Sequence, residues 1–154
     1  MANRGGHVKQ ILVVGGGLIG IRHLEAVKAH PDCSLVGLAD PDMSLEVDAP
    51  RFASMAEVTA AVDGVIIATP THLHAAHGME AAARGWPMLI EKPVAGSLEQ
   101  ARELAKVLQD HKIASLVGHH RRYHRVVQQL KSCLASGQIG DVVTVQVIWA
   151  MRKP

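Results

Sequence analysis

A glycine-rich turn near the start of the chain constrains its fold more than any other feature. Gly15-x-Gly17-x-x-Gly20 directly follows the apolar, β-branched run Ile11–Val14, and a helical period of apolar residues comes after it. A strand, a glycine turn and a helix in this order are typical of a dinucleotide-binding unit. There the first glycine permits a tight turn, the second lets the backbone approach a pyrophosphate, and the third allows close helix–strand packing. The helix N-terminus adds free N–H groups and the positive end of a dipole.

An acidic residue stands where such a unit would bind an adenosine ribose. Asp40 closes the second predicted strand, about 20 residues after the last glycine, which is the expected spacing. Its carboxylate can accept from both ribose hydroxyls and would repel a 2′-phosphate, and no Lys or Arg follows until Arg51. The sequence therefore predicts NAD, with NADP less favoured. A flavin or S-adenosylmethionine could use a related loop, and a ligand-free glycine turn beside a turn-capping aspartate is the structural alternative.

The rest of the chain alternates between predicted strands and helices. The strands are expected at 8–14, 34–39, 51–53, 64–68, 87–90 and 114–117, and the helices at 18–30, 54–62, 71–84, 97–111 and 126–136. Buried strands without polar alternation, separated by helices, indicate a parallel sheet covered on both faces. The sequence therefore predicts an α/β protein with a Rossmann-type, doubly wound parallel sheet over residues 8–140.

Two connections carry local expectations. The segment between Asp42 and Arg51 is short for a crossover helix, and we expect at most one helical turn there. The next helix is predicted to begin at Ser54, with Glu57 as its capping-box partner. The later helix is predicted to begin at Ser97 as N-cap.

The last stretch differs from the preceding strands. Residues 142–151 are mainly apolar, but Thr144 and Gln146 interrupt them, as in a half-buried strand. We expect this stretch to be the first strand of a missing second, α+β domain. The predicted organisation is a flexible leader at 1–7, a nucleotide-binding domain at 8–140, and the start of a truncated substrate and oligomerisation domain at 141–154. If uncovered, Val143, Val145, Val147 and Trp149 would form an apolar surface prone to association, which suggests a homo-oligomer through this last strand.

Composition excludes several other classes of protein. The chain is 48% hydrophobic and 19% charged, with a net charge of only +2, so no nucleic-acid partner is predicted. Cys33 and Cys133 show no metal or disulfide spacing. No apolar run has membrane-spanning length and no signal peptide is recognised, so a cytoplasmic location without a membrane partner is expected.

Three histidines, His72, His74 and His77, lie close together in the sequence. No cysteine or carboxylate accompanies them at ligand spacing, so no metal site is predicted. His74 and His77 are interpreted as residues on the face of a helix.

Four motifs close or follow the later elements. They are Ala68-Thr69-Pro70-Thr71-His72-Leu73-His74, Glu91-Lys92-Pro93, Gly118-His119-His120-Arg121-Arg122-Tyr123 and Gly137-Gln138-Ile139-Gly140. Together they resemble the glucose-fructose oxidoreductase/inositol dehydrogenase/MocA family over about residues 8–149. The Glu-Lys-Pro tripeptide is the most specific of them.

The resemblance implies an NAD-dependent oxidoreductase that transfers hydride between a nicotinamide and a hydroxyl group of a small sugar, polyol or related substrate. It makes Lys92 the catalytic residue, which reaches the substrate hydroxyl and also borders the cofactor, and it implies a cis Lys92–Pro93 peptide bond. The cofactor contacts implied by the glycine turn and the resemblance together are Gly15, Gly17, Leu18, Ile19, Gly20, Asp40, Thr69, Pro70, His72, Glu91, Lys92, His120 and Arg121.

The chain departs from the family in three places. Two histidines precede the paired arginines where Phe-Asn is often found, so a basic surface helix start is the alternative for His120 and Arg121. Family members usually have a helix between Asp42 and Arg51, and they continue into a second domain that completes the catalytic site. A stand-alone NAD-binding or regulatory module, or a relic that binds nothing, therefore remains an alternative to an enzyme.

Overall fold

The computed structural model describes residues 7–148 and 150. It forms two compact units, the first ending at Gly118 and the second beginning at His119. In the part of the chain described, no helix is both long and apolar enough to cross a membrane.

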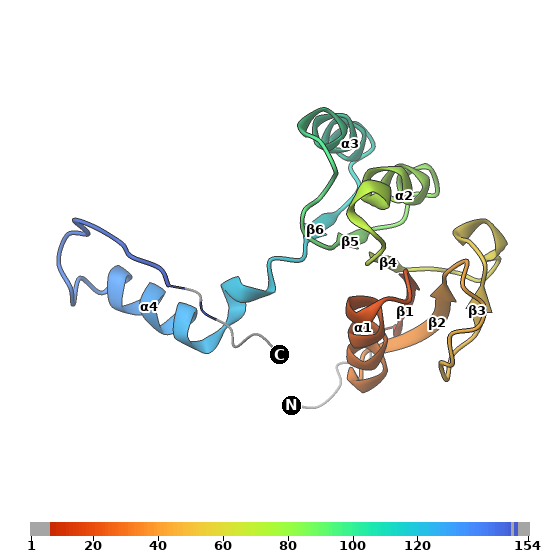
Figure 1. Ribbon diagram of the computed structural model, residues 1–154, viewed down its shortest axis with the longest axis horizontal. Helices are drawn as coiled ribbons and strands as arrows, with labels where there is room; N and C mark the ends of the chain where they lie inside the picture. The colour runs from red at the N-terminus through yellow and green to blue at the C-terminus, as the bar shows by residue number, and fades with distance from the viewer. Residues whose placement is uncertain (1–6, 149, 151–154) are drawn as a thin grey trace. The chain divides into compact units, whose positions relative to one another are not determined.

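The first unit is built on one parallel sheet. Its strands are β1 (Lys9–Val14), β2 (Cys33–Ala39), β3 (Arg51–Phe52), β4 (Gly64–Ile67), β5 (Met88–Ile90) and β6 (Ser115–Val117). They lie in the order β3-β2-β1-β4-β5-β6, and every neighbouring pair is parallel (Figure 1). The chain builds the sheet outward from β1 on one side and then returns to extend it from β4 on the other. This is the doubly wound Rossmann order, so the predicted fold is confirmed.

Helices pack on both faces of this sheet. They are α1 (Leu18–Ala29), α2 (Thr71–Ala83) and α3 (Leu98–Asp110), with a short 3-10 helix, η1 (Met55–Glu57), after β3. Successive residues of a strand point to opposite faces, so Val13 packs with Leu24 of α1 while Leu12 and Val14 belong to the opposite cluster. The second unit contains the 3-10 helix η2 (His120–Tyr123) and helix α4 (Arg125–Ala135).

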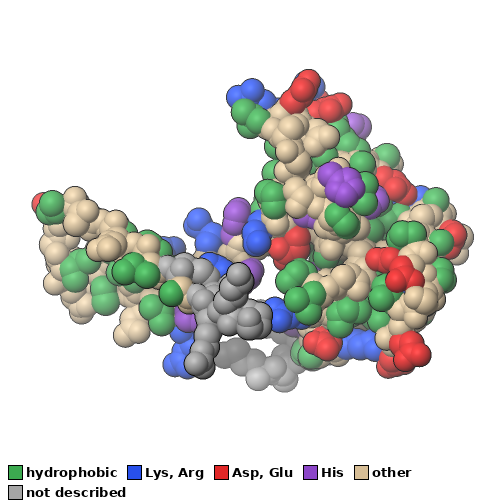
Figure 2. Space-filling model, in the orientation of Figure 1, with side chains coloured by type: hydrophobic (Ala, Val, Ile, Leu, Met, Phe, Trp, Pro, Cys, Tyr) green, Lys and Arg blue, Asp and Glu red, His purple; other side chains and the backbone are tan. Residues whose placement is uncertain are grey.

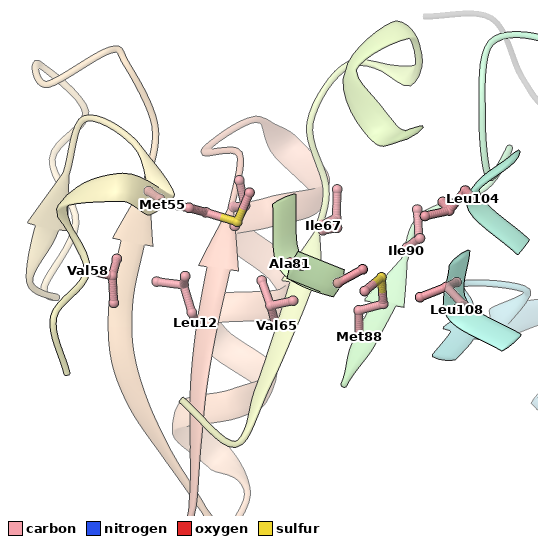
Figure 3. Close-up of a cluster of buried hydrophobic side chains, with 13 residues drawn as sticks. Leu12, Met55, Val58, Val65, Ile67, Ala81, Met88, Ile90, Leu104 and Leu108 are labelled. Carbon is pink, nitrogen blue, oxygen red and sulfur yellow. The ribbon is translucent and has the colours of Figure 1, made fainter. Parts of the chain in front are cut away.

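The larger core lies between the sheet and helices α2 and α3. Leu12, Val65 and Ile67 of the central strands are at most 2% exposed, and Leu104 of α3 is 1% exposed. Figure 3 shows these side chains in one row, from Met55 and Val58 beside β2 to Leu104 and Leu108 of α3. This packing fixes the strands, and their carboxyl ends carry the residues of the candidate site.

The helix predicted over 54–62 is wrong. Only Met55–Glu57 form a helical turn, and the Ser54 side chain makes no capping bond. The Glu57 carboxylate accepts from the Ala53 N–H at 2.8 Å, one residue before the predicted N-cap, so the expected capping box does not form. Met55 and Val58 both bury their side chains within this turn. The chain then has to extend to reach β4 at Gly64.

The expectation of full cover on both faces needs a correction at β6. This edge strand is exposed, with Leu116 at 66% and Val117 at 40%. Within the first unit, an apolar groove of about 450 Å³ lies beside Val27 of α1 and runs over β4, β5 and β6. On this face of the sheet, α1 borders the groove at Val27 without filling it.

The strand predicted over residues 142–151 is also wrong for the residues described. Residues 142–148 and 150 are not assigned to a strand, and Trp149 and Met151 lie outside the described residues. A strand requires hydrogen bonds to a neighbouring strand, and no second sheet is formed by the described residues. The apolar side chains of this segment are exposed instead, Val143 to 95% and Val147 to 83%.

Candidate functional site

The three glycines of the Gly15-x-Gly17-x-x-Gly20 motif, which spans the turn after β1 and the start of α1, have three different surroundings. A Cβ atom on Gly15, whose φ is +97°, would lie 2.7 Å from the backbone nitrogen of Thr69. A Cβ on Gly20 would lie 1.8 Å from the Gly15 carbonyl oxygen, so helix α1 packs closely on the turn. A Cβ on Gly17 would meet nothing within 4 Å. The turn therefore has no room for side chains at two positions and open space at the third.

The N-terminus of α1 opens into that same space. Gly17 is its N-cap and provides no side-chain hydrogen bond. The first backbone N–H groups of a helix have no partner within the helix, and with the helix dipole they favour an anion. Leu18 and Ile19 follow, with 73% and 40% of their surface exposed. The first turn of α1 can therefore bind a phosphate group through its backbone N–H groups, and the Leu18 and Ile19 side chains can cover apolar atoms of the same ligand.

Asp40 faces the glycine turn from the end of β2. One carboxylate oxygen accepts from the Gly16 N–H at 2.6 Å, and the other accepts from the Asp42 N–H at 2.8 Å. These bonds fix the carboxylate beside the turn. Each oxygen keeps a further lone pair for an added hydroxyl donor. The arrangement fits the recognition of a ribose diol.

The connection after Asp40 contains no helix, which agrees with the expectation of at most one helical turn. The Arg51 guanidinium holds it by donating to the carbonyl oxygens of Leu45 and Asp42. The Leu45 side chain lies against Gly16, where a Cβ would be 2.3 Å away. In Figure 2, acidic side chains gather on the side of the first unit where β2 and β3 lie. This surface is unfavourable for an additional phosphate group.

The turn after β4 adjoins the glycine turn. It carries Thr69 and Pro70, and Thr69 lies against Gly15 as described above. The Thr69 hydroxyl lies 3.1 Å from Nδ1 of His77 on α2. His77 is half buried, and this burial is the main cause that lowers its pKa below the ordinary value. His72, in the first turn of α2, is exposed.

The turn after β5 carries Glu91, Lys92 and Pro93. The Lys92–Pro93 peptide bond is cis, as the resemblance implied. The Glu91 carboxylate lies 3.0 Å from Nε2 of His23 on α1, and the side chains of both are largely buried. Lys92 itself is exposed. The exposed Lys92 amine thus lies just after the carboxyl end of β5, and the preceding Glu91 contacts helix α1 through His23.

A buried histidine connects the last two turns. Nε2 of His74 lies 2.7 Å from the Thr69 carbonyl oxygen, and Nδ1 lies 2.7 Å from that of Pro93. His74 is only 1% exposed. The interpretation of His74 as a helix-face residue missed this connection. His23 and Leu45 were also missed, because neither belongs to a motif that the sequence analysis recognised.

The candidate residues of the first unit thus lie together at the end of the sheet where the parallel strands finish. The turns after β1, β2, β4 and β5 all stand at the carboxyl ends of parallel strands, and β1 and β4 flank the point where the strand order reverses. Ligands of doubly wound sheets bind at such a switch point. His120 and Arg121 belong to η2 in the second unit, so their contact with the cofactor stays a prediction.

Comparisons with known proteins agree with this geometry. The model of an oxidoreductase family with an NAD-binding Rossmann fold matches residues 9–119. The rhizopine catabolism protein MocA of Rhizobium meliloti is 31% identical over 150 residues, which cover 92% of this chain and 47% of that protein. Inositol 2-dehydrogenase of the same species is 31% identical over 142 residues, covering 88% of this chain and 43% of that enzyme.

A solved structure extends the likeness to three dimensions. An oxidoreductase from Agrobacterium radiobacter, in complex with NAD+, L-tartaric acid and magnesium, superposes with a TM-score of 0.78 at 25% identity. The match covers 87% of this chain and 42% of that one. The chain thus spans less than half the length of these relatives.

Proposed function

Because the chain belongs to the GFO/IDH/MocA oxidoreductase family, which has an NAD-binding Rossmann fold, we propose that it binds NAD at the carboxyl ends of its parallel strands. The open space at Gly17, between two glycines that have no room for a side chain, carries this proposal. The pyrophosphate would lie against the first turn of α1, and the adenosine ribose would be held by Asp40. The nicotinamide would extend towards Thr69, Pro70, His72, Glu91 and Lys92.

The cofactor preference follows from charge. Asp40 and Asp42 are both acidic, and the pKa of Asp42 is lowered, first by its hydrogen bond from the Ser44 hydroxyl. Arg51, the nearest following cation in the sequence, already donates to two carbonyl oxygens. A 2′-phosphate would therefore meet negative charge, which favours NAD over NADP.

The reaction proposed is hydride transfer between the nicotinamide and a hydroxyl-bearing carbon of a sugar, polyol or related small molecule. Bound NAD supplies the hydride acceptor. Loss of hydride leaves the substrate oxygen to be held and its proton to be taken, and the proposal assigns both tasks to the Lys92 amine. Relatives named for inositol and rhizopine support this class of substrate.

Calorimetric titration tests the cofactor. Wild-type protein is expected to bind NAD more tightly than NADP, and Asp40→Ala is expected to lower NAD affinity by about tenfold or more, the loss of a charge-assisted hydrogen-bond pair. Asp48→Ala, an exposed acidic change in the same connection, is the matched control and should leave NAD binding unchanged. Equal affinity of wild-type protein for NAD and NADP would contradict the preference.

Turnover tests the lysine. NADH formation is measured with inositol and a panel of sugars, for wild-type protein and for Lys92→Met. Turnover that disappears in Lys92→Met while NAD still binds would support the role. Equal turnover in both proteins would exclude it.

A further inference from the structure

His74 combines burial with two short contacts that its position in α2 does not require. Among the described residues of the first unit, His74 is the one polar side chain that is buried, with 1% of its surface exposed. Its two ring nitrogens each lie 2.7 Å from a backbone carbonyl oxygen, one in the turn after β4 and one in the turn after β5. The ring therefore bridges the turn of Thr69 and the turn of Lys92 and Pro93.

The chemistry of the partners determines the hydrogens on the ring. A carbonyl oxygen only accepts, and a neutral imidazole has one N–H and one bare nitrogen. Both hydrogen bonds therefore form together only when both ring nitrogens carry hydrogen. Both distances of 2.7 Å lie within the range of N–H···O hydrogen bonds, so each ring nitrogen is close enough to donate to its carbonyl oxygen.

The surroundings oppose the charge in part. Burial penalises a cation, and so does the N-terminal end of α2, where His74 lies in the first turns. His77 and Glu80 are the titratable neighbours on the same helix, and a charge on His74 lowers the pKa of His77 as a minor cause after burial. In the turn after β5, Lys92 is exposed and Glu91 is paired with His23. The compensation for His74 comes from the two carbonyl oxygens, whose bonds to a charged donor are about twice as strong as neutral ones.

We propose that doubly protonated His74 is a positioning residue, which fixes the turn of Lys92 to the turn of Thr69. Its two hydrogen bonds connect the turns that follow β4 and β5, and the second of these turns carries Lys92. A neutral or replaced side chain releases one turn or both. The bridge itself is a property of the protein alone, and only its effect on nicotinamide binding rests on the proposed function.

The first test reads the ring directly. Nitrogen-15 NMR of the chain without nucleotide reports the hydrogens on the His74 ring. The proposal requires hydrogen on both nitrogens at neutral pH. A ring with one bare nitrogen at neutral pH would overturn it.

Paired variants separate the two bonds. Glutamine places its amide nitrogen near the position of Nε2, and asparagine near that of Nδ1. His74→Gln is therefore expected to release the Pro93 turn, so that backbone order parameters at Lys92 and Val94 fall from about 0.85 towards 0.6. His74→Asn should keep them near the wild-type value. His77→Asn is the matched control, because His77 contacts the Thr69 hydroxyl but not Pro93, and it should also leave them unchanged. Wild-type order parameters in His74→Gln would contradict the bridge.

Nucleotide binding supplies a result that loss of stability alone would not give. ADP-ribose has the adenosine and pyrophosphate of NAD but no nicotinamide. His74→Gln is expected to weaken NAD about tenfold and to leave the affinity for ADP-ribose within about twofold of wild type. An equal loss for both ligands would contradict the positioning role. If the wild-type chain binds no NAD, the proposed function fails, while the ring and order-parameter results still decide the bridge.

Discussion

A pH effect at the scale of single residues is expected from His77. Burial lowers its pKa below the ordinary value of about 6.5, against a smaller raising effect of Glu80. Well above that pH the residue is neutral in both the folded and the unfolded chain. As the pH falls below about 6.5, the unfolded chain takes up a proton that the folded chain resists, so the free energy of unfolding decreases.

Urea denaturation at several pH values measures this effect. The contribution of His77 is the difference between wild-type protein and His77→Gln, since the other histidines are common to both. We expect the stability of wild-type protein to fall more steeply between pH 7 and 5 than that of the variant. Parallel curves for the two proteins would show that His77 does not contribute.

At the same scale, the sequence indicated that the glycine motif and the acid after the second strand belong to one unit, and the structure brings them together. Gly15 and Gly17 lie in the turn after β1, Gly20 lies in the first turn of α1, and Asp40 reaches the turn after β1 because β1 and β2 are adjacent. The partners of His23 and His74 could not be found in this way. His23 meets Glu91 across 68 residues of sequence, and these contacts exist only after the sheet has formed.

At the scale of elements, two serines test what a helix start requires. Both Ser54 and Ser97 precede predicted helices, but only the Ser97 side chain accepts from a helical N–H, that of Gln100 at 3.2 Å. Ser97→Ala should therefore lower the free energy of unfolding by about 1 kcal/mol. Ser54→Ala is the matched control and should change it by less than about 0.5 kcal/mol. Chemical denaturation distinguishes these outcomes, and an equal loss in both variants would contradict the observed cap.

The failed element predictions have a common physical reason. Local propensity suggested a helix after Ser54 and a strand over residues 142–151, but each element also needs a surface or strand to pack on. Around Met55 the core accepts one turn before the chain must reach β4, and the last segment finds no partner strand among the described residues. The parallel strands were predictable because their long apolar runs match the buried centre of a sheet.

At the scale of the whole molecule, the chain corresponds to less than half of its relatives' length. The nucleotide-binding fold was predictable from motifs within this chain, and the substrate class was implied only by the resemblance to the family. The site residues of the second unit, His120 and Arg121, are predictions that the arrangement of the first unit does not test.

The exposed apolar segment near the end of the chain has a consequence for assembly. We propose that Val143, Val145 and Val147 support association of two copies. Analytical ultracentrifugation should then show a concentration-dependent dimer that Val145→Lys weakens. Thr144→Lys, the neighbouring polar position, is the matched control and should have a smaller effect. A monomer at all concentrations would contradict the proposal.

The most direct test of the central claim is calorimetric titration of the chain with NAD, beside Gly17→Asp. Aspartate is a favourable N-cap residue and fits the open space at position 17, so the variant should fold with wild-type stability. Its carboxylate would occupy and repel the place of the pyrophosphate. Gly64→Ala, at the opposite end of β4, is the control for a glycine substitution, since its Cβ would meet only ordinary contacts. We predict saturable NAD binding by wild-type protein and Gly64→Ala, and none by folded Gly17→Asp. Absence of NAD binding to wild-type protein, or equal binding by Gly17→Asp, would contradict the account.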